Sequence, residues 1–182
     1  MIQGHVTNSK LCLNCKECCD FGTEDLWAPF FTKEDVYQVI QKGYSAALFK
    51  RTFDPNVKQV KLIRSHIHRG HRYCPFLDTT TWLCKIYDIR PLDCELWPVI
   101  IVWDKTNKNI LLGLEESCPR KFHQTRKLDN FVSKLKHTLK TKRMINFFTK
   151  HPRLVMDYYE GYTKLTKLDE LTKTVRKKSQ KV

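Results

Sequence analysis

The residues best suited to metal binding or catalysis are eight cysteines. Four of them lie within residues 12–19, C-L-N-C-K-E-C-C. Cys12, Cys15 and Cys18 have the C-x2-C-x2-C spacing with which a loop wraps three thiolates around an iron–sulfur cluster. C-x2-C is also the spacing of a zinc knuckle, in which two thiolates hold one edge of a tetrahedron. Either centre needs further ligands from elsewhere in the chain.

The other cysteines can supply those ligands. They are Cys19, Cys74, Cys84, Cys94 and Cys118. Cys18 and Cys19 are hard to satisfy at one metal, because neighbouring side chains tend to point apart. The spacing therefore predicts two metal centres, or one centre plus a separate thiol, with all eight cysteines as candidate ligands. Three thiols at C-x2-C-x2-C favour an iron–sulfur cluster, of the 4Fe–4S type, over zinc.

Two other interpretations of the cysteines remain open, namely four disulfides and a set of buried, inert thiols. The first residues lack the apolar centre of a secretory signal, so we expect a cytoplasmic protein whose thiols stay reduced. A reducing compartment favours metal binding over disulfides. No apolar run approaches the ~20 residues that cross a bilayer, so no membrane partner is expected.

The cysteines and their neighbours carry a family resemblance. The octet is followed by C-P-F-L at 74–77, C-K-I-Y-D-I-R-P-L-D-C-E-L-W-P at 84–98 and C-P at 118–119. This pattern resembles the YkgJ-type CxxCxxCC cysteine-cluster family, which is described as a zinc- or iron-chelating domain. Flagellin lysine N-methylases carry a similar cysteine pattern, and this resemblance implies a redox or methyl-transfer role as a hypothesis.

One arginine belongs to the same family pattern. In the R-P-x-x-C segment, Arg90 is expected to hydrogen-bond thiolate sulfurs or a carboxylate. It would then modify the properties of the metal centre without binding the metal itself. A purely structural turn is the alternative. The histidines at 66, 68 and 71 are expected in a solvated polar loop. Catalytic residues, substrate and protein partner are not assigned by the sequence.

The charge of the chain is concentrated at its C-terminal end. Residues 120–182 contain 18 Lys or Arg and 5 Asp or Glu, a net charge of +13. They therefore carry almost all of the chain's net charge of +14. The composition shift predicts a cysteine-cluster metal-binding domain at 1–119 and a basic helical extension at 120–182. A zinc-stapled module that binds nucleic acid through the basic extension is the alternative function.

These residues are expected to be positioned by an α+β fold rich in loops. A helix is expected to begin after Thr32, with Asp35 at its third position, and to end at Gly43. Residues 58–64 are read as an edge strand, and residues 98–115 as a β-hairpin with a polar turn. Two C-terminal helices are expected, one from Lys127 to the break at His151–Pro152 and a second after it. Metal binding is expected to couple to folding of residues 12–119.

Overall fold

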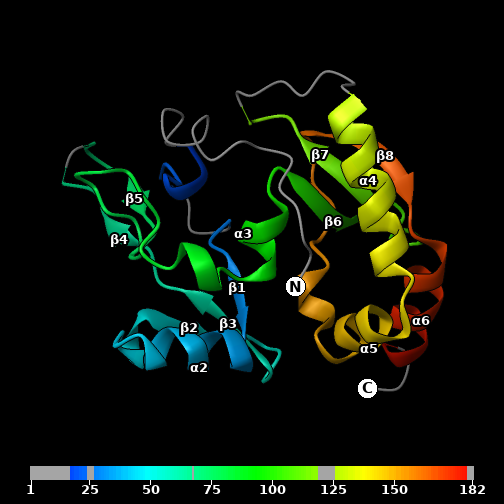
Figure 1. The fold of residues 1–182 in the computed structure, drawn as a ribbon, viewed down its shortest axis with the longest axis horizontal. Coiled ribbons are helices and arrows are strands. Elements are labelled where there is room, and N and C mark those ends of the chain that lie inside the picture. The colour runs from blue at the N-terminus through cyan, green and yellow to red at the C-terminus, as the bar shows by residue number, and fades with distance from the viewer. Residues whose placement is uncertain (1–16, 24–26, 67, 119–125, 180–182) are drawn as a thin grey trace. The chain divides into compact units, whose positions relative to one another are not determined.

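The computed structural model describes residues 17–23, 27–66, 68–118 and 126–179. The chain divides into two compact units, an N-terminal unit that ends at Glu95 and a C-terminal unit that begins at Leu96 (Figure 1). Helices and antiparallel sheets occur in both units, which confirms the α+β class. The hairpin at residues 98–115, expected within the cysteine-cluster domain, belongs to the C-terminal unit, and the domain boundary expected near residue 119 stays a prediction.

The N-terminal unit contains two small antiparallel sheets. The first has the strand order β1-β3-β2, and the second pairs β4 with β5. Their bounds are Phe30–Thr32 for β1, Phe49–Arg51 for β2, Val57–Val60 for β3, Ile63–Arg64 for β4 and Arg72–Tyr73 for β5. The possible edge strand at residues 58–64 is divided between β3 and β4, which belong to different sheets, and the edge position was wrong for β3. β3 is the central strand, because β1 and β2 pair with its two sides.

Helix α2 (Lys33–Gln41) begins and ends where its sequence predicts. The Thr32 hydroxyl accepts a hydrogen bond from the Asp35 backbone N–H at 3.1 Å, and the Asp35 carboxylate accepts from the Thr32 N–H at 2.8 Å. This reciprocal capping box satisfies two N–H groups that the first helical turn leaves without partners. Gly43, with a φ of 90°, follows the helix, so the expected stop is confirmed.

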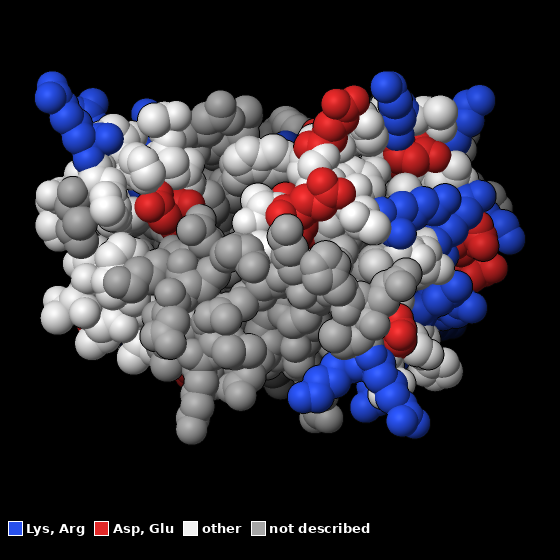
Figure 2. Space-filling model, turned by 90° about the horizontal axis from the view of Figure 1, so that it is seen from above, with Lys and Arg blue, Asp and Glu red and all other residues white. Residues whose placement is uncertain are grey.

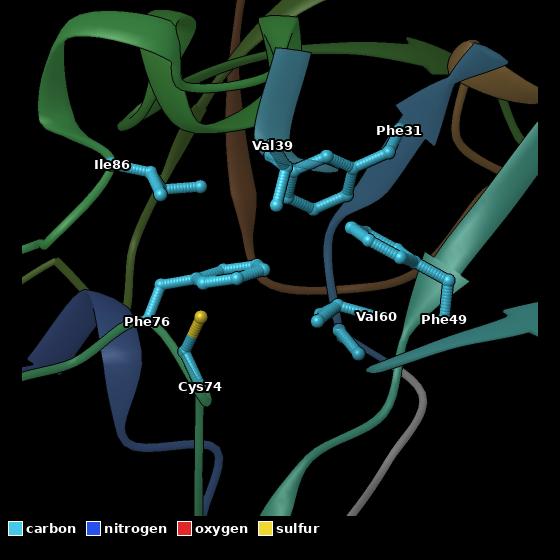
Figure 3. Packing of buried hydrophobic residues seen from close by; sticks show 8 residues of the cluster. Phe31, Val39, Phe49, Val60, Cys74, Phe76 and Ile86 are labelled. Carbon is cyan, nitrogen blue, oxygen red and sulfur yellow. The ribbon is translucent and has the colours of Figure 1, made fainter. Parts of the chain in front are cut away.

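Aromatic side chains fill the core of the N-terminal unit (Figure 3). Phe31 and Phe49 pack edge to face with ring centroids 5.0 Å apart, and Phe76 lies against both. Cys74 is 7% exposed and belongs to the same cluster, with its sulfur beside the Phe76 ring. The hydrophobic core and the cysteine region of this unit are therefore continuous.

The C-terminal unit is built on a three-stranded antiparallel sheet with the order β6-β7-β8. Its strands are Val99–Trp103 (β6), Ile110–Glu115 (β7) and Tyr162–Lys167 (β8). The β6–β7 pair confirms the expected hairpin. β8 overturns the expected helix after Pro152, because this segment pairs along β7 and shifts register by a bulge between Leu112 and Gly113.

Three helices follow the chain through this unit, where two were expected. They are Arg126–Leu139 (α4), Lys142–Lys150 (α5) and Asp169–Ser179 (α6). The first expected helix is interrupted at Lys140 and Thr141, because Thr141 caps α5 by accepting from the Met144 N–H. α5 ends at Lys150, which confirms the expected break at His151–Pro152, and Pro152 opens a short 3-10 turn.

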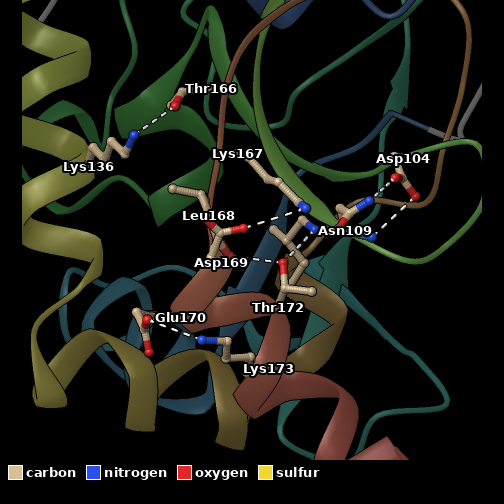
Figure 4. Close-up of polar contacts among 11 residues, drawn as sticks. Asp104, Asn109, Lys136, Thr166, Lys167, Leu168, Asp169, Glu170, Thr172 and Lys173 are labelled. Atoms are coloured by element: carbon tan, nitrogen blue, oxygen red, sulfur yellow. Dashed lines mark hydrogen bonds and ion pairs between the residues drawn. The ribbon is translucent and has the colours of Figure 1, made fainter.

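Polar contacts tie these helices to the sheet (Figure 4). The Lys136 ammonium on α4 donates to the Thr166 hydroxyl on β8 at 3.0 Å. The Thr172 hydroxyl on α6 accepts from the Ile110 backbone N–H at 2.8 Å and donates to the Leu168 carbonyl. The Lys136–Thr166 and Thr172–Ile110 contacts join segments that are far apart in the sequence, so the helices are held against defined strands. In the described ranges, no helix has both the length and the apolar character that crossing a bilayer requires.

Candidate metal centre

Cys19 and Cys74 meet through both backbone and side chain. Cys19 ends a 3-10 turn at Glu17–Cys19, and its carbonyl accepts a hydrogen bond from the Cys74 N–H at 3.0 Å. The next residue, Asp20, forms a β-bridge with Tyr73. The Cys19 side chain packs against the core cluster that contains Cys74. The second half of the cysteine octet is thereby held against the segment that carries Cys74.

A tight turn returns the chain from Cys74 to Cys84. Leu77 and Cys84 form an antiparallel bridge, and the Lys85 N–H donates to the Phe76 carbonyl at 2.8 Å. The Asp78 carboxylate accepts from the two backbone N–H groups of the threonines at 80 and 81, at 2.9 and 3.1 Å. These bonds fix the turn, so the half-buried Cys84 thiol faces the same region as Cys74.

Cys94 lies on the short helix α3 (Leu92–Leu96), which begins directly after Pro91. One oxygen of Asp93 accepts from the Phe30 backbone N–H at 3.0 Å, which ties α3 to strand β1. Pro91 fits the start of a helix, where a missing N–H costs no hydrogen bond. The R-P-x-x-C segment thus positions its cysteine through a helix start and one long-range hydrogen bond.

The thiols affect one another electrostatically. The hydrogen bond to the Cys74 thiol, followed by burial, raises the pKa of Cys19 well above its ordinary value. Burial and then the neighbouring Cys19 raise the pKa of Cys94. Burial is also the main cause of the raised pKa of Cys84, to which Cys19 contributes. Deprotonating these grouped thiols therefore requires compensating positive charge, which a bound cation supplies.

Arg90 supplies part of that positive charge. Its guanidinium lowers the pKa of three thiols, those of Cys19, Cys84 and Cys94. The guanidinium carbon lies 3.7 Å from the centroid of the Tyr87 ring, and Nε donates to the Tyr87 carbonyl at 3.1 Å. The arginine is therefore held in place by its own turn while its charge acts on the thiols.

The four remaining predicted ligands are Cys12, Cys15, Cys18 and Cys118. Cys12 and Cys15 are outside the described residues. Cys18 is exposed, and Cys118 is buried in the C-terminal unit. Within the part of the chain that the structure describes, no three His, Cys, Asp or Glu side chains are grouped so that they could hold a metal ion. Metal binding by the described thiols would therefore require them to draw closer.

Sequence reasoning missed one ion pair beside the cysteines. Nδ1 of His71 lies 3.0 Å from each carboxylate oxygen of Asp20, the residue that follows Cys19. The ring of His68 packs against that of His71 with centroids 5.4 Å apart, whereas His66 is exposed. The pairing joins residues 51 positions apart, and the only sequence signal for it was an acid next to a cysteine.

Comparisons with known proteins identify a family for the cysteine-containing part of the chain. The family model CxxCxxCC, described as "Putative zinc- or iron-chelating domain", matches residues 11–119. A protein of Methanocaldococcus jannaschii named "Uncharacterized protein MJ0661" is 35% identical over 91 residues. That match covers 48% of this chain and 43% of the relative, so the chain spans less than half of the relative's length. The comparison with solved structures found no match.

Proposed function

Because the chain belongs to the CxxCxxCC family of zinc- or iron-chelating domains, we propose that its N-terminal unit binds metal through Cys19, Cys74, Cys84 and Cys94. The observation that carries this proposal is the packing of Cys19 and Cys84 against the core cluster that contains Cys74, in the same unit as Cys94 on α3 and Arg90. Four thiolates satisfy either a 4Fe–4S cluster or a tetrahedral zinc site.

The donor set fits either metal by its chemistry. Thiolates are soft ligands that select zinc and iron–sulfur clusters over magnesium or calcium. Cys19, Cys74, Cys84 and Cys94 are free thiols, so they are available as ligands. A bound metal would supply the positive charge that favours the thiolate forms, and the ligand positions are spread from the 3-10 turn to α3. The metal would thus link the segments of the unit.

We propose an iron–sulfur cluster in preference to zinc. Cys12 and Cys15 complete the C-x2-C-x2-C spacing with Cys18 and lie only a few residues from Cys19. Together with Cys18 they can supply three thiolates to a second centre or replace ligands of the first, and Cys118 stays a predicted ligand. A zinc site needs four thiolates and leaves the remaining cysteines without a role, whereas a cluster loop uses the triplet directly.

A cysteine-to-serine series tests the assignment. Full-length protein is purified without oxygen, and iron, zinc and acid-labile sulfide are counted per chain for each variant. Cys19→Ser and Cys94→Ser are each expected to reduce bound metal to less than half of the wild-type content. Wild-type metal content in both variants would overturn the ligand assignment. Cys118→Ser, in the other unit, distinguishes a centre confined to the N-terminal unit from one that needs Cys118.

A redox or methyl-transfer role rests on the resemblance to flagellin lysine N-methylases. It predicts that protein loaded with the cluster binds S-adenosylmethionine, which isothermal titration calorimetry can measure. A cluster-loaded protein that binds no S-adenosylmethionine would exclude methyl transfer from this donor. In a reducing compartment such as the cytoplasm, the four thiols would remain available for the metal.

A further inference from the structure

Helices α4 and α5 carry a strongly basic segment that the metal centre does not use. Between Asp129 and Asp157 the chain has seven Lys or Arg residues and no Asp or Glu. Lys134, Lys140, Lys142 and Arg143 are exposed, and we refer to these four as the basic surface. They fall within ten residues, across the turn that joins the two helices.

The basic surface lies on the side of the helices that points away from the core. α4 buries Leu128, Phe131, Leu135 and Leu139, and α5 buries Phe148. Figure 2 shows Lys and Arg side chains gathered toward the right-hand side of the face seen from above. The charge is therefore presented to solvent, while the apolar stripes hold the helices in place.

Internal ion pairing does not account for these charges. In the same unit, Lys105, Arg153, Lys167 and Lys173 each pair with an acidic residue. None of the four residues of the basic surface forms an ion pair with any residue that the structure describes. Their positive charge remains available to an external anion.

Helix stability does not account for them either. Lys142 and Arg143 occupy the first turn of α5, and this turn contains no acidic residue. The helix dipole disfavours cations at this end by about 0.3–1 kcal/mol each. The sequence therefore retains two charges that cost local stability.

The side chains around the basic surface indicate which kind of anion it can bind. The large hydrophobic side chains that are exposed among the described residues all lie in the N-terminal unit. The basic surface therefore has no apolar anchor of the type that holds a helix in a membrane interface. None of the described Phe, Tyr or Trp side chains of this unit is exposed enough to stack on an unpaired base. Charge without stacking or insertion matches the regularly spaced phosphates of a duplex.

We propose that the basic surface of α4 and α5 binds the phosphate backbone of duplex nucleic acid without reading its sequence. Binding of this type releases counterions, so the logarithm of affinity falls with the logarithm of salt concentration by about 0.9 per phosphate contact. Four contacts predict a slope of about −3.6. This activity is separate from metal binding, because it uses a different unit of the chain.

The test measures the binding of a labelled short duplex of mixed sequence by fluorescence anisotropy over a range of salt concentrations. The full-length variant Lys140→Gln/Lys142→Gln/Arg143→Gln is compared with Lys33→Gln/Arg51→Gln/Lys61→Gln. The control removes the same charge from exposed positions of the N-terminal unit. Metal content and circular dichroism establish that both variants are loaded and folded like the wild type.

The variant of the basic surface is expected to bind at least about tenfold more weakly at 0.1 M salt, with a slope shallower by about 2.7. The control variant is expected to keep the wild-type slope. Equal losses in both variants, or an unchanged slope in the first, would overturn the proposal. Binding to anionic lipid vesicles without duplex binding, or tighter binding to the unpaired strand, would overturn it as well.

Discussion

At the residue scale, Arg90 is the charged group with the widest influence on the thiols. Its guanidinium lowers the pKa of three of them and is anchored over the Tyr87 ring. Replacing a residue that contacts a metal ligand typically changes metal affinity by about 10- to 100-fold. We therefore expect Arg90→Gln to lose metal to a competing chelator at least about tenfold faster than the wild type.

Arg90→Lys is the matched control, because it keeps the charge and loses the planar stacking on Tyr87. We expect its rate of metal loss to lie between those of the wild type and Arg90→Gln. If Arg90→Gln kept its metal as long as the wild type, the arginine would be a structural part of the turn and would not tune the centre.

Asp104 stabilises the turn of the β6–β7 hairpin. Its burial alone would raise its pKa, but hydrogen bonds from Asn109, Thr106 and the Lys108 N–H outweigh this and lower the pKa well below the ordinary value. A carboxyl group whose pKa is lower in the folded state stabilises the fold above its unfolded pKa of about 4. This stabilisation is lost as the pH falls through the folded value.

We expect Asp104→Asn to reduce the free energy of unfolding by about 1–2 kcal/mol at neutral pH. The difference from the wild type should shrink as the pH falls below about 4, because the carboxyl group of the unfolded wild type then takes up a proton and that of the folded state does so only at lower pH. Urea denaturation at a series of pH values measures it. A difference that does not change across this range would show that the charge of Asp104 contributes nothing.

At the element scale, the register of β7 and β8 depends on a close approach at Gly113. A β-carbon added there would lie 2.6 Å from the Tyr162 ring and 3.1 Å from Ile100. The ring belongs to the layer of Trp97, Met156, Tyr159 and Tyr162 that packs on this face of the sheet. The Tyr159 hydroxyl in this layer donates to the Glu115 carboxylate. Tyr162 therefore cannot move without disturbing its neighbours.

We expect Gly113→Ala to destabilise the protein by about 1–3 kcal/mol, as overpacking usually does. Thermal unfolding of the single variants and of Gly113→Ala/Tyr162→Leu provides a double-mutant cycle. The loss at Gly113 should be smaller in the Tyr162→Leu background, because the clashing ring is gone. Additive losses would place the strain elsewhere than between these two residues.

Local signals made some elements predictable. The capping box of Thr32 and Asp35 and the polar turn between β6 and β7 act within a few residues, and both predictions are confirmed. The spacing of Tyr158, Tyr162 and Leu165 suits a helix, but this segment contains a strand because it pairs with β7, far away in the sequence. β3 was taken as an edge strand for the same reason, since its second partner lies upstream.

The candidate site, like the fold, was predictable from the sequence only in part. The cysteines and Arg90 were recognisable from their spacing and from the family pattern. The sequence could not tell which thiols meet, because Cys19, Cys74 and Cys94 are joined by contacts across tens of residues. The pairing of Asp20 with His71 was missed because nothing local to either residue indicates it.

At the scale of the whole molecule, the two proposed activities, metal binding and duplex binding, belong to different units. The N-terminal unit carries the four grouped thiols, and the C-terminal unit carries the basic surface. Ligands that bind only the folded state stabilise the part of the chain that contains their site. Removing the metal should therefore loosen the N-terminal unit selectively.

We expect hydrogen exchange after chelation to accelerate at N-terminal amides such as those of Cys74 and Lys85. The amides of the β6–β7 ladder, such as that of Leu112, should keep their protection. Mass spectrometry of peptides from metal-loaded and chelated protein makes the comparison. Equal loss of protection in both units would contradict a centre confined to the N-terminal unit.

The central claim, that the cysteines hold an iron–sulfur cluster, is tested most directly by the composition of the wild-type protein. Iron, zinc and acid-labile sulfide are counted per chain in protein purified without oxygen, together with its visible absorption spectrum. We predict comparable amounts of iron and sulfide, and a broad visible absorption that bleaches on reduction. A colourless protein with stoichiometric zinc would contradict the cluster, and a protein with neither metal would contradict metal binding altogether.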